Sequence, residues 1–148
     1  AEERAAGVRG RFAAARELHA SALDALLHAL TQAGDQIDTP EALANDLALV
    51  QMYLHEPEFH AHALAHATAT LAEIRALLDE AAQAGELTEC DPDDLSRTVQ
   101  TAYTGALATW AVYRSGALDE WLRGEIEAVL EPYRPMGEGG SAGEAPAP

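Results

Sequence analysis

Apolar residues recur at steps of three and four along most of the chain, which is the period of one face of an α-helix. The successive stripes run over Val8–Leu30, Leu43–Leu54, Phe59–Leu78, Leu95–Tyr113 and Leu118–Val129. No segment alternates apolar and polar residues as a half-buried strand does. The pattern therefore predicts an all-α protein.

Glycine and proline mark the ends of the predicted helices. Gly34 and Gly116 are suited to end a helix, because glycine adopts the left-handed conformation found after the last turn. Thr39 and Asp91 each precede a proline, so each provides an N-cap followed by proline at the first helical position. Pro57 separates two further helices, since proline disfavours a helical residue before it.

The first helical segment covers residues 4–33. Its apolar positions fit one long helix or two nearly continuous ones. A break is expected near Gly7 or Gly10, because glycine weakens a helix interior.

These elements predict an antiparallel bundle of about five to six helices over residues 1–134. Alanine supplies much of the 48% hydrophobic content and aromatic residues only 5%, which favours close packing of helices. Residues 135–148 are rich in glycine, proline and alanine and have no apolar anchor, so we expect a disordered tail. No apolar run reaches the roughly 18 residues of a membrane span. The single cysteine, Cys90, excludes an internal disulfide and is typical of a cytoplasmic protein.

The net charge of −16 is unevenly distributed. Residues 1–16 carry four arginines and two acids, whereas the rest of the chain carries five arginines and 23 acids. Such an acidic surface repels phosphate, so this chain is not expected to bind nucleic acid itself. The chain begins with Ala1 rather than methionine, so we expect an upstream segment attached to the basic end.

Four of the six histidines lie close together in the sequence, at His55, His60, His62 and His66. The spacing of His62 and His66 places two imidazoles on one side of a helix, where they can chelate zinc. Ala63 stands where a metalloprotease motif has glutamate, and no third ligand is evident. We therefore predict no metal and no cofactor, with the His62–His66 pair as the alternative.

No catalytic pattern is visible in the sequence. Cys90 lies among acidic residues, which disfavour a reactive thiolate. There is no nucleophile elbow and no glycine-rich phosphate loop before a helix. We predict that the protein is not an enzyme.

Large side chains are scarce, so each fills space that alanine cannot. Some of them could line a cavity with a few polar groups, as ligand pockets do, or all could simply fill the core. The pocket candidates are Phe12, Met52, Tyr53, Phe59, His62, Tyr103 and Trp110.

Two consecutive segments resemble a known family. They are PEFHAHALAHATATLAEIRALLDEAAQAG, ending at Gly85, and GELTECDPDDLSRTVQTAYTGALATWAVYRSGALDEWLRGEIEAVL, ending at Leu130. The order of the predicted helices and the sequence pattern of these segments resemble the C-terminal effector-binding and dimerisation half of TetR-family transcriptional repressors. The resemblance covers most of the chain from Gly10 to Tyr133.

The resemblance implies a homodimer in which the last two helices form a four-helix bundle with those of a second copy. It also implies a small, mostly apolar effector that alters DNA binding by an N-terminal helix-turn-helix domain, which this chain lacks. The alternatives are a free-standing all-α interaction or scaffold protein and a His-based metal-binding protein. The interface candidates that the resemblance implies are Leu95, Val99, Ala102, Ala106, Trp121, Leu122, Ile126 and Val129.

Overall fold

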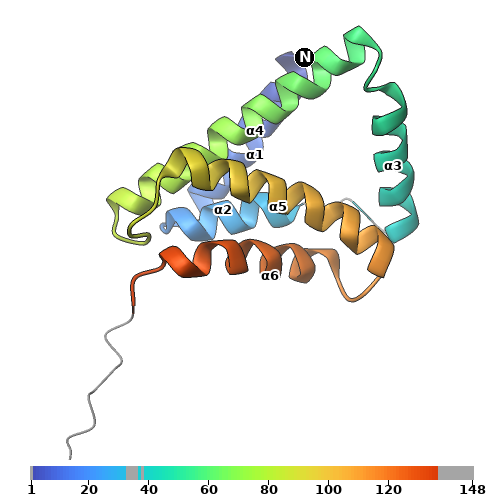
Figure 1. Ribbon diagram of the computed structural model, residues 1–148. Helices are drawn as coiled ribbons and strands as arrows, with labels where there is room; N and C mark the ends of the chain where they lie inside the picture. The colour runs from blue at the N-terminus through green and yellow to red at the C-terminus, as the bar shows by residue number, and fades with distance from the viewer. Residues whose placement is uncertain (1, 33–36, 38, 137–148) are drawn as a thin grey trace, which may run out of the picture.

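The computed structural model describes residues 2–32, 37 and 39–136, and its regular structure there is entirely helical. The elements are α1 (Glu2–Leu18), α2 (Ala22–Thr31), α3 (Pro40–Tyr53), α4 (Pro57–Gln83), α5 (Pro92–Tyr113), α6 (Leu118–Leu130) and a short 3₁₀ turn, η2 (Glu131–Tyr133) (Figure 1). The all-α prediction is confirmed for the described part of the chain. Gly34 and nearly all of the predicted tail lie outside the described residues.

The helices pack around α4 and α5. Helix α4 contacts α1, α2 and α5, and α5 also contacts α3 and α6 (Figure 1). Helix α2 lies between the α1–α4 pair and α6. Helix α3 extends away from the body of the bundle and packs mainly against α5.

Two apolar clusters form the core. The larger one unites α1, α2, α4, α5 and α6, and its fully buried side chains include Phe12, Leu26, Leu30, Ile74, Leu77, Leu78, Val99, Ile126 and Leu130. The smaller one joins the start of α3 to the ends of α5 and α6, through Leu43, Ala106, Trp110, Ala111, Leu118 and Leu122. Tyr103 packs against both clusters and so lies between them.

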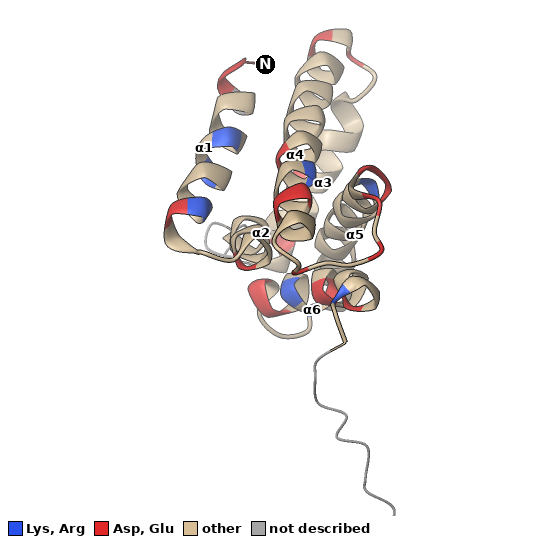
Figure 2. Ribbon diagram, turned by 90° about the vertical axis from the view of Figure 1, so that its left-hand side faces the viewer, with Lys and Arg blue, Asp and Glu red and all other residues tan. Residues whose placement is uncertain are grey.

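The described arginines of the N-terminal part lie along α1, whereas acidic residues are spread over the other helices (Figure 2). Arg16 fastens α1 to α4 through two acids: its Nη1 lies 2.9 Å from Oε2 of Glu73, and its Nε lies 3.4 Å from Oε1 of Glu80. The basic end of the chain is therefore held against α4.

The break between the first two helices falls at residues 19–21, so the expectation of a break near Gly7 or Gly10 is wrong. Ser21 caps α2 by accepting a hydrogen bond from the amide of Asp24 at 3.2 Å. Glu86 lies 64 residues after Ala22 and accepts a hydrogen bond from the Ala22 amide N–H at 2.9 Å. The Glu86 carboxylate also accepts a hydrogen bond from the Ser21 hydroxyl. A carboxylate from the α4–α5 connection thus occupies the N-terminus of α2, where the helix dipole favours negative charge.

We predict that Glu86→Ala lowers the free energy of unfolding by about 1–3 kcal/mol, because it leaves two partly buried donors without their charged acceptor. Urea unfolding near neutral pH measures the change. Glu125→Ala is the control, since Glu125 is exposed on α6 and its loss should change stability by less than about 0.5 kcal/mol. Equal midpoints for the two variants would contradict the capping role of Glu86.

Candidate ligand-binding opening between three helices

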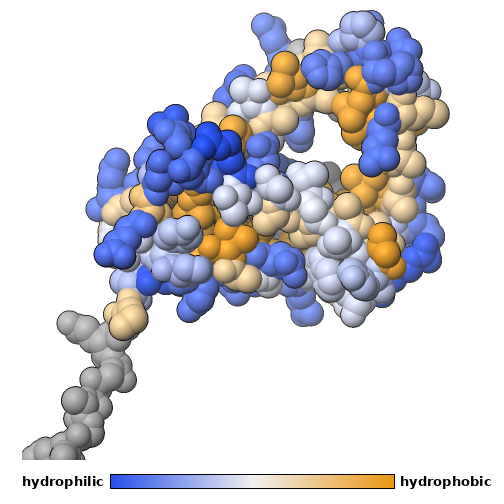
Figure 3. Space-filling model, viewed as in Figure 1, coloured by the Kyte–Doolittle hydropathy of each residue, from blue (hydrophilic) through white to orange (hydrophobic). Residues whose placement is uncertain are grey.

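The N-terminal half of α4 projects beyond the core. All of the buried residues of α4 lie at Thr70 or later. Where α4 leaves the core it crosses α5, and the Gln100 side-chain amide donates to the backbone carbonyl of Ala67 at 2.8 Å. Beyond this crossing the two helices diverge, and α3 spans the space between them (Figure 1). The space-filling view shows that the molecule is hollowed there (Figure 3). We call this hollow, which lies between the end of α3, the beginning of α4 and the later part of α5, the opening.

Helix α3 presents apolar side chains to the opening. Leu43 is buried and Leu47 half-buried against the smaller cluster, as the apolar stripe predicts. Val50 and Leu54 continue the same stripe, but they are 41% and 40% exposed because no helix lies opposite them. Residues at steps of three and four share one side of a helix, so this pair faces the opening.

The corner between α3 and α4 holds two aromatic rings. Tyr53 and Phe59 lie on either side of the turn, with ring centroids 5.8 Å apart and a tilted arrangement typical of aromatic pairs. His62 is half-buried one turn after Phe59 on α4. Met52 lies on the opposite side of α3 from the Leu47–Val50–Leu54 stripe, so the structure does not bring it into the opening.

Tyr103 lies at the corner between α4 and α5, one turn after Gln100. Burial raises the pKa of the Tyr103 phenol above its ordinary value, while the nearby Arg11 guanidinium pulls that pKa the other way. The hydroxyl therefore stays protonated at neutral pH and is available as a hydrogen-bond donor. Arg11 lies on α1, and the Cζ atom of its guanidinium group lies 5.5 Å from the centroid of the Phe12 ring.

The remaining pocket candidates are part of the core. Phe12 has no exposed surface and packs in the larger cluster. Trp110 is 5% exposed, and its indole N–H donates to the backbone carbonyl of Gly116 at 3.2 Å, which fixes the turn into α6. The structure thus pairs Tyr53 with Phe59 at the corner between α3 and α4, packs Tyr103 between the two core clusters, and places Phe12 and Trp110 in the core. Reasoning from sequence missed Arg11, because charge alone does not show which arginine turns inward.

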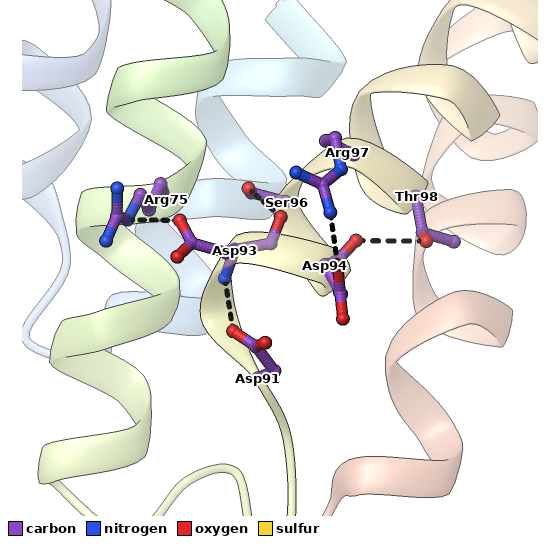
Figure 4. Close-up of polar contacts among 7 residues, drawn as sticks. All are labelled: Arg75, Asp91, Asp93, Asp94, Ser96, Arg97 and Thr98. Atoms are coloured by element: carbon purple, nitrogen blue, oxygen red, sulfur yellow. Dashed lines mark hydrogen bonds and ion pairs between the residues drawn. The ribbon is translucent and has the colours of Figure 1, made fainter.

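The start of α5 is fixed against α4 by a network of polar contacts (Figure 4). The Asp91 carboxylate accepts the amide of Asp93 at 2.9 Å, as its N-cap position predicts. The Arg75 Nε on α4 lies 2.9 Å from Oδ1 of Asp93, and the Ser96 hydroxyl donates to the Asp93 carbonyl at 2.8 Å. These contacts anchor one end of the α4–α5 pair, so the divergence occurs at the other end.

The dimer-interface candidates are mostly internal. Leu95, Val99, Ala106, Leu122 and Ile126 are buried within the chain itself, so they are not available to a second copy. Ala102, Trp121 and Val129 are half-buried, and the Trp121 indole N–H donates to the Ala106 carbonyl at 3.0 Å. The exposed sides of the same two helices instead carry Thr101, Gly105, Ala108, Val112, Gly124 and Ala128.

The histidine cluster does not assemble into a metal site in the part of the chain that is described. No group of three or more His, Cys, Asp or Glu side chains there is arranged to hold a metal ion. His62 is half-buried and His66 is exposed.

Comparisons with protein-family models, with curated proteins and with solved structures found no match to this chain. Within the described residues, no helix is both long enough and apolar enough to cross a membrane.

We predict that Ile126→Ala lowers the free energy of unfolding by about 2–5 kcal/mol, because Ile126 is fully buried and its truncation leaves a cavity. Urea unfolding of Leu18→Ala provides the matched control, since Leu18 is 68% exposed at the end of α1. The control should change stability by less than about 0.5 kcal/mol. A loss of self-association by Ile126→Ala at unchanged stability would show instead that Ile126 belongs to an interface.

Proposed function

We propose that this chain is the ligand-sensing and homodimerisation domain of a TetR-like transcriptional repressor. The observation that carries the proposal is the apolar stripe of α3, which leaves the core at Leu47 and continues, exposed, along the opening. Exposed apolar surface around a hollow is typical of sites that bind small apolar molecules. The Tyr103 hydroxyl and the His62 imidazole supply the few polar groups that orient such a ligand.

The arrangement of helices suits a sensor. A ligand in the opening would contact α3, α4 and α5 together, and the best-packed residues of α3, Leu43 and Leu47, lie near its beginning. Helix α4 also holds α1 through Arg16 and Glu73. A change in the position of α4 would therefore reach the basic end of the chain, where the resemblance places the DNA-binding domain. The ligand needs only a different affinity for the two positions.

The exposed sides of α5 and α6 support the dimerisation part of the proposal. The α5 side carries small residues at steps of three and four, at Thr101, Gly105 and Ala108, and ends at Val112, which is 77% exposed. Small residues allow two helices to approach closely, as in a helix bundle.

One observation favours the alternative of an interaction protein. Leu49 and Met52 lie on the side of α3 away from the opening and are 48% and 54% exposed. A helix that is apolar on both sides is usually covered on both sides. A protein partner against the outer side of α3 would account for Leu49 and Met52, whereas a ligand in the opening would account for Val50 and Leu54.

We predict that wild-type protein binds the neutral fluorescent probe N-phenyl-1-naphthylamine and that Val50→Asp weakens this binding at least about tenfold. The substitution places an ionised carboxylate on the apolar wall of the opening, which an apolar ligand cannot solvate. Fluorescence titration gives the affinities. Leu18→Asp, an equally drastic change at an exposed leucine on α1, should leave them unchanged. Failure of the wild-type protein to bind the probe, or equal weakening by both variants, would remove the support for a ligand site here.

We predict that the chain sediments as a dimer and that Ala108→Arg shifts it to monomer, because a long charged side chain prevents close approach of α5 to its copy. Sedimentation velocity over a series of concentrations measures the distribution. Ala61→Arg, on the exposed surface of α4, is the control and should remain dimeric. A wild-type chain that is monomeric at every concentration would contradict dimerisation.

A further inference from the structure

A second hollow, a groove open to solvent, lies between α4 and the first turns of α5. It is next to the polar network that fixes the start of α5 (Figure 4). Its volume is about 340 Å³, which is within the range typical of small-molecule sites. The groove is separate from the opening, because the opening lies along the later part of α5.

The lining that α4 contributes to the groove is largely apolar. It includes Leu71, Ala72 and Ala76, of which Leu71 and Ala76 are half-buried and Ala72 is exposed. Ala72 and Ala76 are four residues apart, so they lie on one side of the helix. Their short side chains do not fill the space beside α5. An apolar surface within a groove favours the binding of a ligand with an apolar body.

The charged side chains that line the groove differ in their pairing. The Nε of Arg75 lies 2.9 Å from Oδ1 of Asp93. Arg97 is ion-paired to Asp94, one turn earlier on α5. Asp79 is half-buried, and it forms no ion pair and no side-chain hydrogen bond with any described residue. Both arginines of the groove are therefore already paired, whereas the Asp79 carboxylate has no cation beside it.

This pairing determines which charge a ligand of the groove can carry. An anion would have to displace Asp93 or Asp94 from an arginine, and it would be repelled by Asp79. A cation would pair with Asp79 without breaking either ion pair. The attraction is stronger at a half-buried carboxylate than at an exposed one, because less water screens the two charges. The net charge of −16 also attracts cations to the protein from a distance.

We propose that the groove between α4 and α5 binds a small organic cation. Its ammonium group pairs with Asp79, and its apolar body lies against Leu71, Ala72 and Ala76. The site therefore selects an amine over an alcohol or a carboxylate of the same shape. This inference concerns a site distinct from the opening and does not rest on the proposed function.

Three naphthalene derivatives of matched shape test the inference. At neutral pH 1-naphthylmethylamine is a cation, 1-naphthalenemethanol is neutral and 1-naphthoate is an anion. NMR titration of isotope-labelled protein measures each affinity and identifies the amides that respond. We expect the amine to bind about tenfold more tightly than the alcohol, the difference made by one charge-assisted contact, and the carboxylate to bind most weakly. The amide shifts should be largest around Ala72, Ala76 and Ser96.

Two variants separate the charge from the apolar surface. Asp79→Asn should lower the affinity for the amine to that for the alcohol, because it keeps the shape of the side chain and removes its charge. Glu125→Gln is the matched control, since it removes one negative charge from an exposed position on α6 and should change neither affinity. Ala72→Trp fills the groove from an exposed position and should weaken the amine and the alcohol alike.

Equal affinities of the wild-type protein for the amine and the alcohol would overturn the inference. An unchanged preference for the amine in Asp79→Asn would also overturn it. Wild-type affinities in Ala72→Trp would show that the ligands bind elsewhere. Circular dichroism establishes that each variant is folded, and if Asp79→Asn does not fold, the wild-type comparison and Ala72→Trp decide the question.

Discussion

The opening depends on one mismatch of length: α4 is longer than the core against which it packs. Its 27 residues span about 40 Å, but its buried positions begin only at Thr70. Before that point, the beginning of α4 contacts the turn after α3 through the Tyr53–Phe59 pair. The hydrogen bond from Gln100 to Ala67 joins α4 and α5 near their crossing. The positions of the helices around the opening therefore depend on where α4 and α5 cross.

This arrangement leaves apolar surface in water, and that is unfavourable in a free chain. Val50 and Leu54 lie on a stripe whose first members, Leu43 and Leu47, are well packed, so the exposure is not due to the helix itself. The apolar stripe of α3 extends further along the helix than the helices that pack against it. Covering such surface stabilises a protein by about 25 cal/mol for each Å² removed from water, which gives an apolar ligand a physical reason to bind.

Much of the fold was predictable from local signals. Thr39 and Asp91 cap α3 and α5 as their sequence positions indicate, and Pro57 begins α4. The break between α1 and α2 was not predictable, because Ser21 acts there together with Glu86, a residue distant in sequence. Glycine at positions 7 and 10 is a local signal that tertiary contacts override, since Val8 and Phe12 hold α1 continuous against the core.

The candidate site was predictable only in part, for a similar reason. Periodicity shows that a face is apolar but not what covers it. It therefore could not separate Leu95 and Val99, which the chain covers itself, from Val50 and Leu54, which it leaves exposed. Charge in the sequence has the same limitation. Arg11 lies two residues after Arg9, and only the structure shows that Arg11 is half-buried near Tyr103 whereas Arg9 is exposed.

The contacts of α1 determine how a ligand could influence the rest of a longer protein. Helix α1 carries Arg16, which is paired to Glu73 on α4. A ligand bound in the opening would draw α3 and α4 together. Because α4 holds α1 through this ion pair, a movement of α4 would act on the helix at the basic end of the chain. The position of α1 would thus depend on whether the opening is occupied.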